Sequence, residues 1–359
     1  MSLDSSDLNR RIKWGYATHT IDDPPACGGD LRGRLLTSED PPNRNDVIVA
    51  EVLALGRHSR IELTSGRRAR LFPGDLIGIA YGNRYATRQW CGVMPEHGDV
   101  CHLLSVGGVC GEVITMVPDF KEPTVLRPLG YLSGPDGKRL NLGDFALQPR
   151  VSGESRPTTI LVVGSGMDSG KTTAAASLIH GLALSGAKVF AAKLTGTAAP
   201  KDLWYMEDSG AARVMDFTDV GHASTAGASN DELWRILTTV ESHFAVENPD
   251  YVVLEIADGI AQRETTMLLE LAQSHGCIDH VIYTCCDSPG AQVGVERVRN
   301  YGMHVVAVAG MVACGPLAAQ EARALTDVPV LESADLSNPS VTSMLVKPAA
   351  VENRRGAVG

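Results

Sequence analysis

Two kinds of hydrophobic pattern divide the chain near its middle. In the first part, apolar residues come in short runs at 46–55, 59–66, 68–82 and 109–117, and Gly, Pro and Asn residues separate these runs. Short β-prone runs at this spacing predict a small β-barrel or β-sandwich. The segment TSGRR between two of the runs predicts the tip of a hairpin.

After residue 158 the pattern alternates between strands and helices. Strands that are apolar throughout and separated by helices predict a mainly parallel sheet covered on both faces. The expected strands are 159–165, 187–194, 250–258, 280–287, 304–313 and 328–332. The expected helices are 170–185, 231–245, 264–274, 290–301 and 316–324.

These patterns predict an α/β domain preceded by a small all-β domain. A chain of 359 residues is comfortable for two domains. The expected parts are an irregular lead-in at 1–45, the β-domain at 46–117, a connecting segment at 118–158, the α/β domain at 159–343 and a tail at 344–359.

A glycine-rich segment, GSGMDSGKTT, stands between the first strand and the first helix of the α/β domain. Glycines let the backbone turn tightly so that its N–H groups face phosphate oxygens, and the helix N-terminus adds a partial positive charge. We expect Lys171 to contact the β- and γ-phosphates of a nucleotide and the Thr172 hydroxyl to coordinate Mg²⁺. The expected nucleotide-binding residues are Gly164, Ser165, Gly166, Met167, Asp168, Ser169, Gly170, Lys171, Thr172 and Thr173.

The spacing of this loop is unusual. Five residues separate Gly164 from Gly170, whereas the common form GxxxxGK[ST] has four. The loop therefore resembles that of dethiobiotin synthetase, GTDxExGKT, and the P-loop class that also contains cobyrinate amidases, nickel-chaperone GTPases and polynucleotide 5′-kinases. Ser165 takes the place of the family Thr, and Asp168 takes that of the family acid. Gly166 departs from the family, which has Asp there.

The resemblance implies further site residues. Lys193 ends the strand after the loop helix, where the family has a lysine that touches phosphate and substrate. Glu255 ends the next core strand, where the family has an acid that binds Mg²⁺. Because parallel strands deliver side chains from their carboxyl ends into one crevice, we expect both residues to lie near the loop. For a further metal-binding acid of the family, the candidates are Asp216 and Asp219, with Asp208 behind them, and Asp216 stands first.

The resemblance covers about residues 159–332 and implies a Mg-ATP-dependent phosphotransferase, a kinase or ligase-like enzyme that acts on a small-molecule acceptor. Lys171, Lys193 and Glu255 would be its catalytic residues. No counterpart of the family's purine-reading Asn stands in AGMVACGP, so ATP is expected and GTP stays open. The alternatives are a nucleotide-hydrolysing switch or metallochaperone GTPase and a polynucleotide 5′-kinase. The class also implies a homo-oligomer.

The net charge of the chain indicates which kinds of partner it can bind. A net charge of −10 and a pI near 5.5 disfavour nucleic acid and acidic membranes as partners. No apolar run approaches the roughly 20 residues of a membrane span, and the N-terminus lacks the apolar stretch of a signal peptide. We therefore expect a cytoplasmic protein. Its eight cysteines, none in a CxxC pair, are then expected to be reduced thiols.

Other polar residues have no settled role. Asp258 and Arg263 fit substrate contact and a solvated loop equally well, whereas His222 fits a mobile surface loop better than a base. Cys285 and Cys286 fit the core of a strand, and Asp287 or Ser288 after them is a candidate for contact with base or substrate. The segment 81–85, YGNRY, fits either stacking on a base or a hairpin turn.

The β-domain is rich in arginine. These side chains fit solvated strand faces better than contact with a polyanion or with the anionic end of a substrate. They are Arg57, Arg60, Arg67, Arg68, Arg70, Arg84 and Arg88.

Overall fold

The computed structural model describes residues 10–25, 28–31, 33–37, 40–96, 100–151 and 156–346. The chain divides into two compact units. The first consists of Met1–Pro149, Thr195–Asp202 and Asp216–Thr239, and the second consists of Arg150–Leu194, Leu203–Met215 and Val240–Gly359. The first unit therefore includes two segments that the sequence pattern assigned to the α/β domain.

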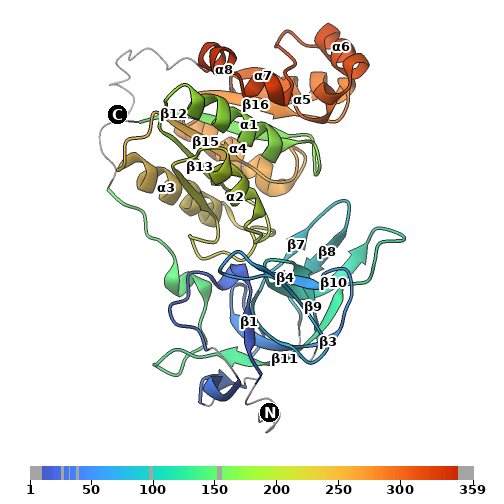
Figure 1. Ribbon diagram of the computed structural model, residues 1–359, viewed down its shortest axis with the longest axis vertical. Coiled ribbons are helices and arrows are strands. Elements are labelled where there is room, and N and C mark those ends of the chain that lie inside the picture. The colour runs from blue at the N-terminus through green and yellow to red at the C-terminus, as the bar shows by residue number, and fades with distance from the viewer. Residues whose placement is uncertain are drawn as a thin grey trace. The chain divides into compact units, whose positions relative to one another are not determined.

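A closed five-stranded barrel forms the centre of the first unit (Figure 1). Its strands are β3 (Val47–Ala54), β6 (Leu76–Tyr81), β9 (Cys101–Ser105), β10 (Val109–Met116) and β11 (Thr124–Leu132). The neighbours run β6, β3, β11, β9 and β10, and pairing of β10 with β6 closes the circle. Of the predicted barrel or sandwich, the structure has the barrel.

The apolar runs that predicted the barrel fill much of its interior, and β9 and β11 supply the rest. All six residues of β6 are buried, and the β6 residue Gly78 has no room for a side chain because the Trp14 ring lies against it. Burial of such side chains is the main favourable contribution to folding. The apolar core of the barrel includes Ile48, Ala50, Val52, Ile61, Leu71, Ile77, Ile79, Leu103 and Leu126.

Further short elements surround the barrel. The lead-in is not irregular throughout, since β1 (Ile12–Trp14) pairs with β6 and β2 (Leu35–Leu36) pairs with β11. The connecting segment likewise supplies β11 itself. The predicted hairpin at TSGRR is confirmed. It consists of β4 (Arg60–Glu62) and β5 (Arg68–Arg70). The remaining short elements are β7 (Arg84–Tyr85), β8 (Trp90–Val93) and the 3₁₀ turns η1 (Tyr16–Thr18), η2 (Gly28–Leu31) and η3 (Leu142–Phe145).

The two later segments of the first unit are tied to the barrel strands and to each other. The buried Ser105 hydroxyl donates to the Ala198 carbonyl at 3.0 Å. The Ala223 amide donates to Asn45 Oδ1 at 2.9 Å, and the Ala198 amide donates to the Ala223 carbonyl at 2.9 Å. Segments far apart in sequence thus complete one folded unit.

A six-stranded sheet forms the centre of the second unit. Its strands are β12 (Thr158–Gly164), β13 (Val189–Lys193), β14 (Arg213–Asp216), β15 (Tyr251–Glu255), β16 (His280–Thr284) and β17 (Val305–Ala309), in the order β14-β13-β15-β12-β16-β17. β12 pairs in parallel with β15 and β16, β13 with β15, and β16 with β17. The predicted parallel sheet is confirmed, with β12 near its centre.

Helices flank this sheet (Figure 1). They are α1 (Lys171–Leu184), α2 (Lys201–Asp208), α3 (Asn230–Ala245), α4 (Arg263–His275), α5 (Ser288–Asn300), η4 (Met311–Cys314), α6 (Pro316–Leu325), α7 (Ser333–Leu336) and α8 (Pro339–Leu345). The core beneath α1 includes Ile160, Val162, Leu178, Ile179, Leu182, Val253 and Ile282.

Some details of the second unit differ from the predicted pattern. The predicted strand 328–332 forms only a single parallel bridge, between Val330 and Val308, because Pro329 removes one of the N–H donors that a strand needs. The tail that was expected from residue 344 begins inside α8, and its residues 347–359 lie outside the described part of the chain.

Within the described residues, no helix is long and apolar enough to cross a membrane.

Candidate functional site

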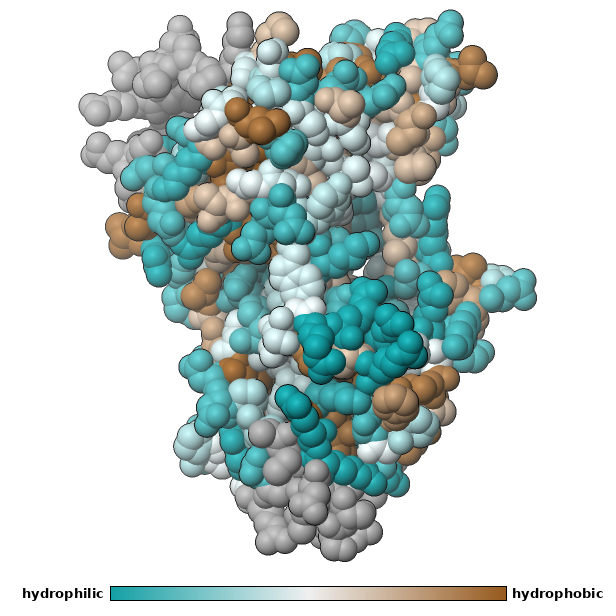
Figure 2. All heavy atoms as spheres, in the orientation of Figure 1, coloured by the Kyte–Doolittle hydropathy of each residue, from teal (hydrophilic) through white to brown (hydrophobic). Residues whose placement is uncertain are grey.

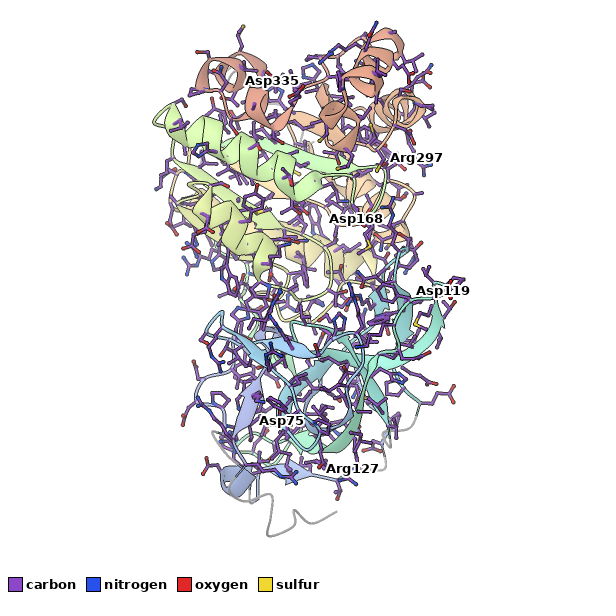
Figure 3. The ribbon with its side chains drawn as sticks, turned by 45° about the vertical axis from the view of Figure 1, so that its right-hand side comes forward. Asp75, Asp119, Arg127, Asp168, Arg297 and Asp335 are labelled. Atoms are coloured by element: carbon purple, nitrogen blue, oxygen red, sulfur yellow. The ribbon has the colours of Figure 1, made fainter. Side chains whose placement is uncertain are left out.

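The glycine-rich loop joins β12 to α1 in the second unit. Asp168 and Gly170 have positive φ angles of 63° and 94°, and Asp168 is labelled on this loop in Figure 3. Two bonds to the end of β16 hold the loop: the Ser165 amide donates to the Thr284 carbonyl at 2.8 Å, and the buried Ser169 and Thr284 hydroxyls lie 2.8 Å apart. The loop is therefore a held, tightly turned backbone segment.

The loop leaves peptide donors available for an anion. Among the residues that the structure describes, the N–H groups of Gly166, Met167, Ser169 and Gly170 donate to no protein acceptor. The N-terminus of the 14-residue α1 follows directly and adds its partial positive charge. Such donors at a helix N-terminus fit phosphate oxygens.

Lys171 extends across this loop. Its Nζ donates to the Gly166 carbonyl at 2.7 Å and to the Asp258 carbonyl at 2.6 Å. Burial lowers the pKa of Lys171, and the nearby Glu255 carboxylate opposes that shift. The ammonium group is thus positioned inside the loop, where a bound phosphate would replace neutral carbonyl oxygens as its partner.

Three predicted site residues lie together where β13 and β15 end and α1 begins. They are Lys193 of β13, Glu255 of β15 and Thr172 of α1. Lys193 and Glu255 are partners in the register of β13 and β15. The Lys193 Nζ lies 3.5 Å from Glu255 Oε1, and the Thr172 hydroxyl donates to the same oxygen at 3.1 Å. Glu255 is only 1% exposed. The structure therefore brings together three of the residues that the sequence singled out.

This donor set fits Mg²⁺. A hydroxyl and a carboxylate are hard oxygen ligands, and Mg²⁺ at nucleotide sites is commonly held by one or two protein oxygens together with substrate phosphates. Thr172 and Glu255 would supply these oxygens.

Two glycines that the sequence analysis did not single out let other loops approach. A Cβ at Gly259 would clash with the Ser165 carbonyl, and one at Gly310 would clash with the Ser169 carbonyl. Gly310 also has a φ of +88°. The only sequence signal for either residue is a glycine shortly after a core strand, a signal that many loops share.

Asp216, the third predicted metal ligand, belongs to a buried network in the first unit. Its carboxylate accepts from the Thr218 amide at 2.6 Å and from the Tyr16 hydroxyl at 3.3 Å, and its own amide donates to Asp219 at 2.8 Å. His19 Nε2 lies 3.3 Å from Asp219 Oδ1. Burial and the neighbouring Asp219 charge raise the pKa of Asp216 to about 6. A metal-binding role for Asp216 stays a prediction.

The described residues contain no group of three or more His, Cys, Asp or Glu side chains placed to hold a metal ion. The seven cysteines in the described part of the chain are free thiols.

The other polar candidates lie in different surroundings. Asp258 contributes its carbonyl to Lys171, as described above, and has a φ of +59°. Arg263 is exposed at the start of α4. His222 is buried rather than on a mobile surface, and burial lowers its pKa to about 4. The expectation of a surface histidine was therefore wrong.

The residues after β16 cap a helix. Cys285 is buried as predicted, whereas Cys286 is exposed, which corrects its expected place in the strand core. Asp287 caps α5 by accepting from the Gly290 amide at 2.7 Å, and the Ser288 hydroxyl donates to Glu321 at 2.9 Å. These contacts give Asp287 and Ser288 a structural role, and contact with a base or substrate stays a prediction.

The parallel sheet, the strand–loop–helix geometry and the GKT sequence together define a P-loop nucleotide-binding fold. Lys171 and Thr172 occupy the positions that contact phosphate and metal in such folds.

No family model matches the chain, and no curated protein matches it. The signal recognition particle receptor FtsY from Elizabethkingia anophelis is similar in structure, with 18% identity, 58% of this chain and 65% of that chain covered and a TM-score of 0.32. The same receptor in complex with GDP has 16% identity and a TM-score of 0.36, with 56% of this chain and 68% of that chain covered. The kinase domain of the Escherichia coli tyrosine kinase ETK has 13% identity and a TM-score of 0.33, with 44% of this chain and 68% of that chain covered. Likenesses this distant carry no argument about activity or substrate.

Proposed function

We propose that this protein is a Mg-ATP-dependent phosphotransferase, a kinase or ligase-like enzyme of the dethiobiotin synthetase-like class, that acts on a small-molecule acceptor. The observation that carries the proposal is the meeting of Lys193, Glu255 and Thr172 beside the phosphate loop. A nucleotide-binding loop alone needs only Lys171 and the backbone. A second lysine and a buried acid supply the additional charges that phosphoryl transfer uses.

Each charged or polar residue of the site would have a different role in phosphoryl transfer. The loop N–H groups and Lys171 would bind the β- and γ-phosphates and fix the chain of phosphate groups in line with the acceptor. Lys193 would neutralise charge that develops on the transferred group. Glu255 and Thr172 would hold Mg²⁺, which supplies further charge neutralisation on the phosphate oxygens. Because the transition state needs positioning and electrostatic stabilisation, no protein nucleophile is required.

Turnover of γ-labelled ATP and GTP with Mg²⁺ tests this proposal in a panel of small carboxylate, amine and hydroxyl acceptors. Lys171→Ala and Lys193→Ala should each lower the rate roughly 10²–10³-fold, because each removes a charge that stabilises the transition state. Lys188→Ala is the matched control. Lys188 is a surface lysine that precedes β13 and bonds the Glu247 carbonyl, so its variant should keep the wild-type rate.

Three results would contradict the proposal. Near-wild-type turnover in Lys171→Ala would place the chemistry elsewhere. GTP hydrolysis without any phosphorylated product would indicate a switch or metallochaperone. Transfer of the label to the 5′ end of an oligonucleotide would indicate a polynucleotide kinase.

A further inference from the structure

The first unit contains a pocket that the proposed nucleotide chemistry does not use. Its volume is about 360 Å³, near the lower end of the range for small-molecule sites. Segments from four parts of the unit form its wall: residues 57–60 with β4, Arg68 of β5, residues 84–89, and residues 105–106. Thr197 and Ala199 of one later segment complete it.

The charge of the pocket wall has one sign. Four arginines and a histidine line the pocket, and no aspartate or glutamate does. Arg68 is compensated by the buried Glu62 outside the lining. Within the part of the chain that the structure describes, Arg57 and Arg60 form no ion pair with a carboxylate, and the Arg57 guanidinium lies 5.2 Å from the centre of the Phe120 ring. The wall therefore presents uncompensated positive charge, which excludes a cation as the natural occupant.

Arg84 is held in place rather than extended into water. Its guanidinium donates to the Leu104 carbonyl and, at 2.6 Å, to Gln89 Oε1, and it lies 5.6 Å from the centre of the Trp90 ring. A positioned guanidinium loses little further freedom on binding and presents a planar fork of donors. Such forks match phosphate and carboxylate oxygens in bidentate geometry.

His58 packs into the same wall as Arg84. Its Nε2 lies 3.1 Å from the Leu104 carbonyl and 3.4 Å from Arg84, and its ring packs edge-on against Trp90. Burial and the neighbouring arginines lower the pKa of His58 to about 4.

From the four arginines that line this pocket and the absence of acidic side chains among its lining residues, we infer that it binds a small molecule through a phosphate-monoester group. Arg57, Arg60 and Arg84 contact the phosphate, and Ser59 and Thr197, which carry hydroxyl groups, line the same pocket. This site is separate from the phosphate loop and does not depend on the proposed phosphotransferase activity.

Size and charge favour this ligand class. A phosphate monoester carries about −1.5 to −2 charges at pH 7 and three acceptor oxygens, which several guanidinium groups can share. A pocket of this volume accommodates a small phosphorylated molecule rather than a stretch of polymer. Figure 2 shows strongly hydrophilic side chains gathered over the part of the first unit where Figure 1 labels β4.

Isothermal titration calorimetry on the full chain tests the inference, with inorganic phosphate and glycerol 3-phosphate as probes. The titrations are run in the Lys171→Ala background and with the loop saturated by a non-hydrolysable nucleotide, so that the loop itself takes up no probe. We expect saturable binding in both conditions, and weaker binding as NaCl is raised, because the pocket is open to screening ions.

The double variant Arg57→Gln, Arg60→Gln should bind glycerol 3-phosphate at least about tenfold more weakly, because each arginine contributes charge-assisted hydrogen bonds. The control is Arg67→Gln, Arg70→Gln, which removes two exposed arginines of the same hairpin that do not line the pocket and should leave the affinity unchanged. Unchanged thermal unfolding of both variants shows that the barrel is intact.

Several outcomes would overturn the inference. Absence of saturable binding of either probe would do so, as would equal weakening in both double variants. Loss of binding in Lys171→Ala would assign the phosphate to the nucleotide loop. Binding of succinate with no binding of either phosphate probe would reassign the pocket to dicarboxylates. Each of these results leaves the turnover experiment on the nucleotide site unaffected, so the two proposals fail independently.

Discussion

The surroundings of Asp216 disfavour the charged form of its carboxylate, because the group is buried and lies near the negative charge of Asp219. It is 1% exposed, and the carboxylate of Asp219 is hydrogen-bonded to its amide. The folded state therefore binds a proton at Asp216 more tightly than the unfolded chain does. Stability that depends on this proton is fully present below the ordinary aspartate pKa near 4, and it is lost as pH rises through about 6.

The variant Asp216→Asn should flatten that pH dependence. Asparagine keeps the size of the side chain and cannot ionise, so the free energy of unfolding should change less between pH 4.5 and pH 7 than it does in the wild type. The difference should be on the order of 1–3 kcal/mol. Urea denaturation at the two pH values measures it.

Asp208→Asn is the control for this prediction, because Asp208 is an exposed carboxylate at the end of α2. If Asp216→Asn and the wild type show parallel pH profiles, the assignment of the raised pKa to Asp216 is wrong.

At the residue scale, the sequence predicted the role of a residue where that role depends on its immediate neighbours in the chain. Lys171 and Thr172 could be assigned from GKT because the loop builds its own geometry. The partners of Lys171 could not be assigned, since both are backbone carbonyls, at Gly166 and Asp258, and every residue type carries a carbonyl.

At the scale of elements, the phosphate loop is held between the ends of two other strands. The turn after β17 passes so close to the loop that only a glycine fits at position 310, and the Met311 amide donates to the Ser169 carbonyl at 3.1 Å. The geometry of the loop thus depends on a turn about 140 residues later in the chain.

Gly310→Ala should therefore destabilise the second unit and weaken nucleotide binding. The added Cβ clashes with the Ser169 carbonyl, and the positive φ strains any residue other than glycine, so we expect a loss of about 1–3 kcal/mol or more. Chemical denaturation measures the stability, and fluorescent-nucleotide titration measures the affinity.

Gly166→Ala is the comparison within the same loop, because a Cβ there meets no atom within 4 Å. Its free energy of unfolding without nucleotide should stay near the wild-type value. Equal stability of the Gly310 and Gly166 variants would show that the close approach at Gly310 does not constrain the loop.

The elements themselves were largely predictable. The five expected helices appear within about two residues of their predicted ends, because each has an apolar face at helical spacing. β9 and β11 were not expected. In β11, Pro128 and Gly130 obscure the strand pattern, and pairing with β2, β3 and β9 holds it. The short strand β14 and helix α2 were likewise too brief for their periodicity to be read.

At the scale of the whole molecule, each compact unit is assembled from separate stretches of chain. The first unit needs Thr195–Asp202 and Asp216–Thr239, which bond to barrel residues such as Ser105 and Asn45. An N-terminal fragment ending at residue 149 would leave these buried polar groups without partners.

Such a fragment, residues 1–149, should be markedly less stable than the same unit in the full chain. Loss of several buried hydrogen bonds, each contributing about 1 kcal/mol, should lower its melting temperature by roughly 10 °C or more. Circular dichroism melts of the fragment and of the full chain measure the difference. A fragment that unfolds cooperatively at the temperature of the full chain would show that the later segments do not stabilise the barrel.

The sequence by itself determined the phosphate loop and the alternation of strand and helix around it, because glycine spacing, GKT and apolar periodicity act over stretches of ten to twenty consecutive residues. Only the tertiary structure decided the division into units and the arginine-lined pocket. Arg57, Arg84 and Thr197 lie far apart in the chain and line one pocket only when the barrel closes and the later segment joins it. The arginine-rich sequence of the β-domain shows that such charges exist, whereas only the fold brings them to the wall of one pocket.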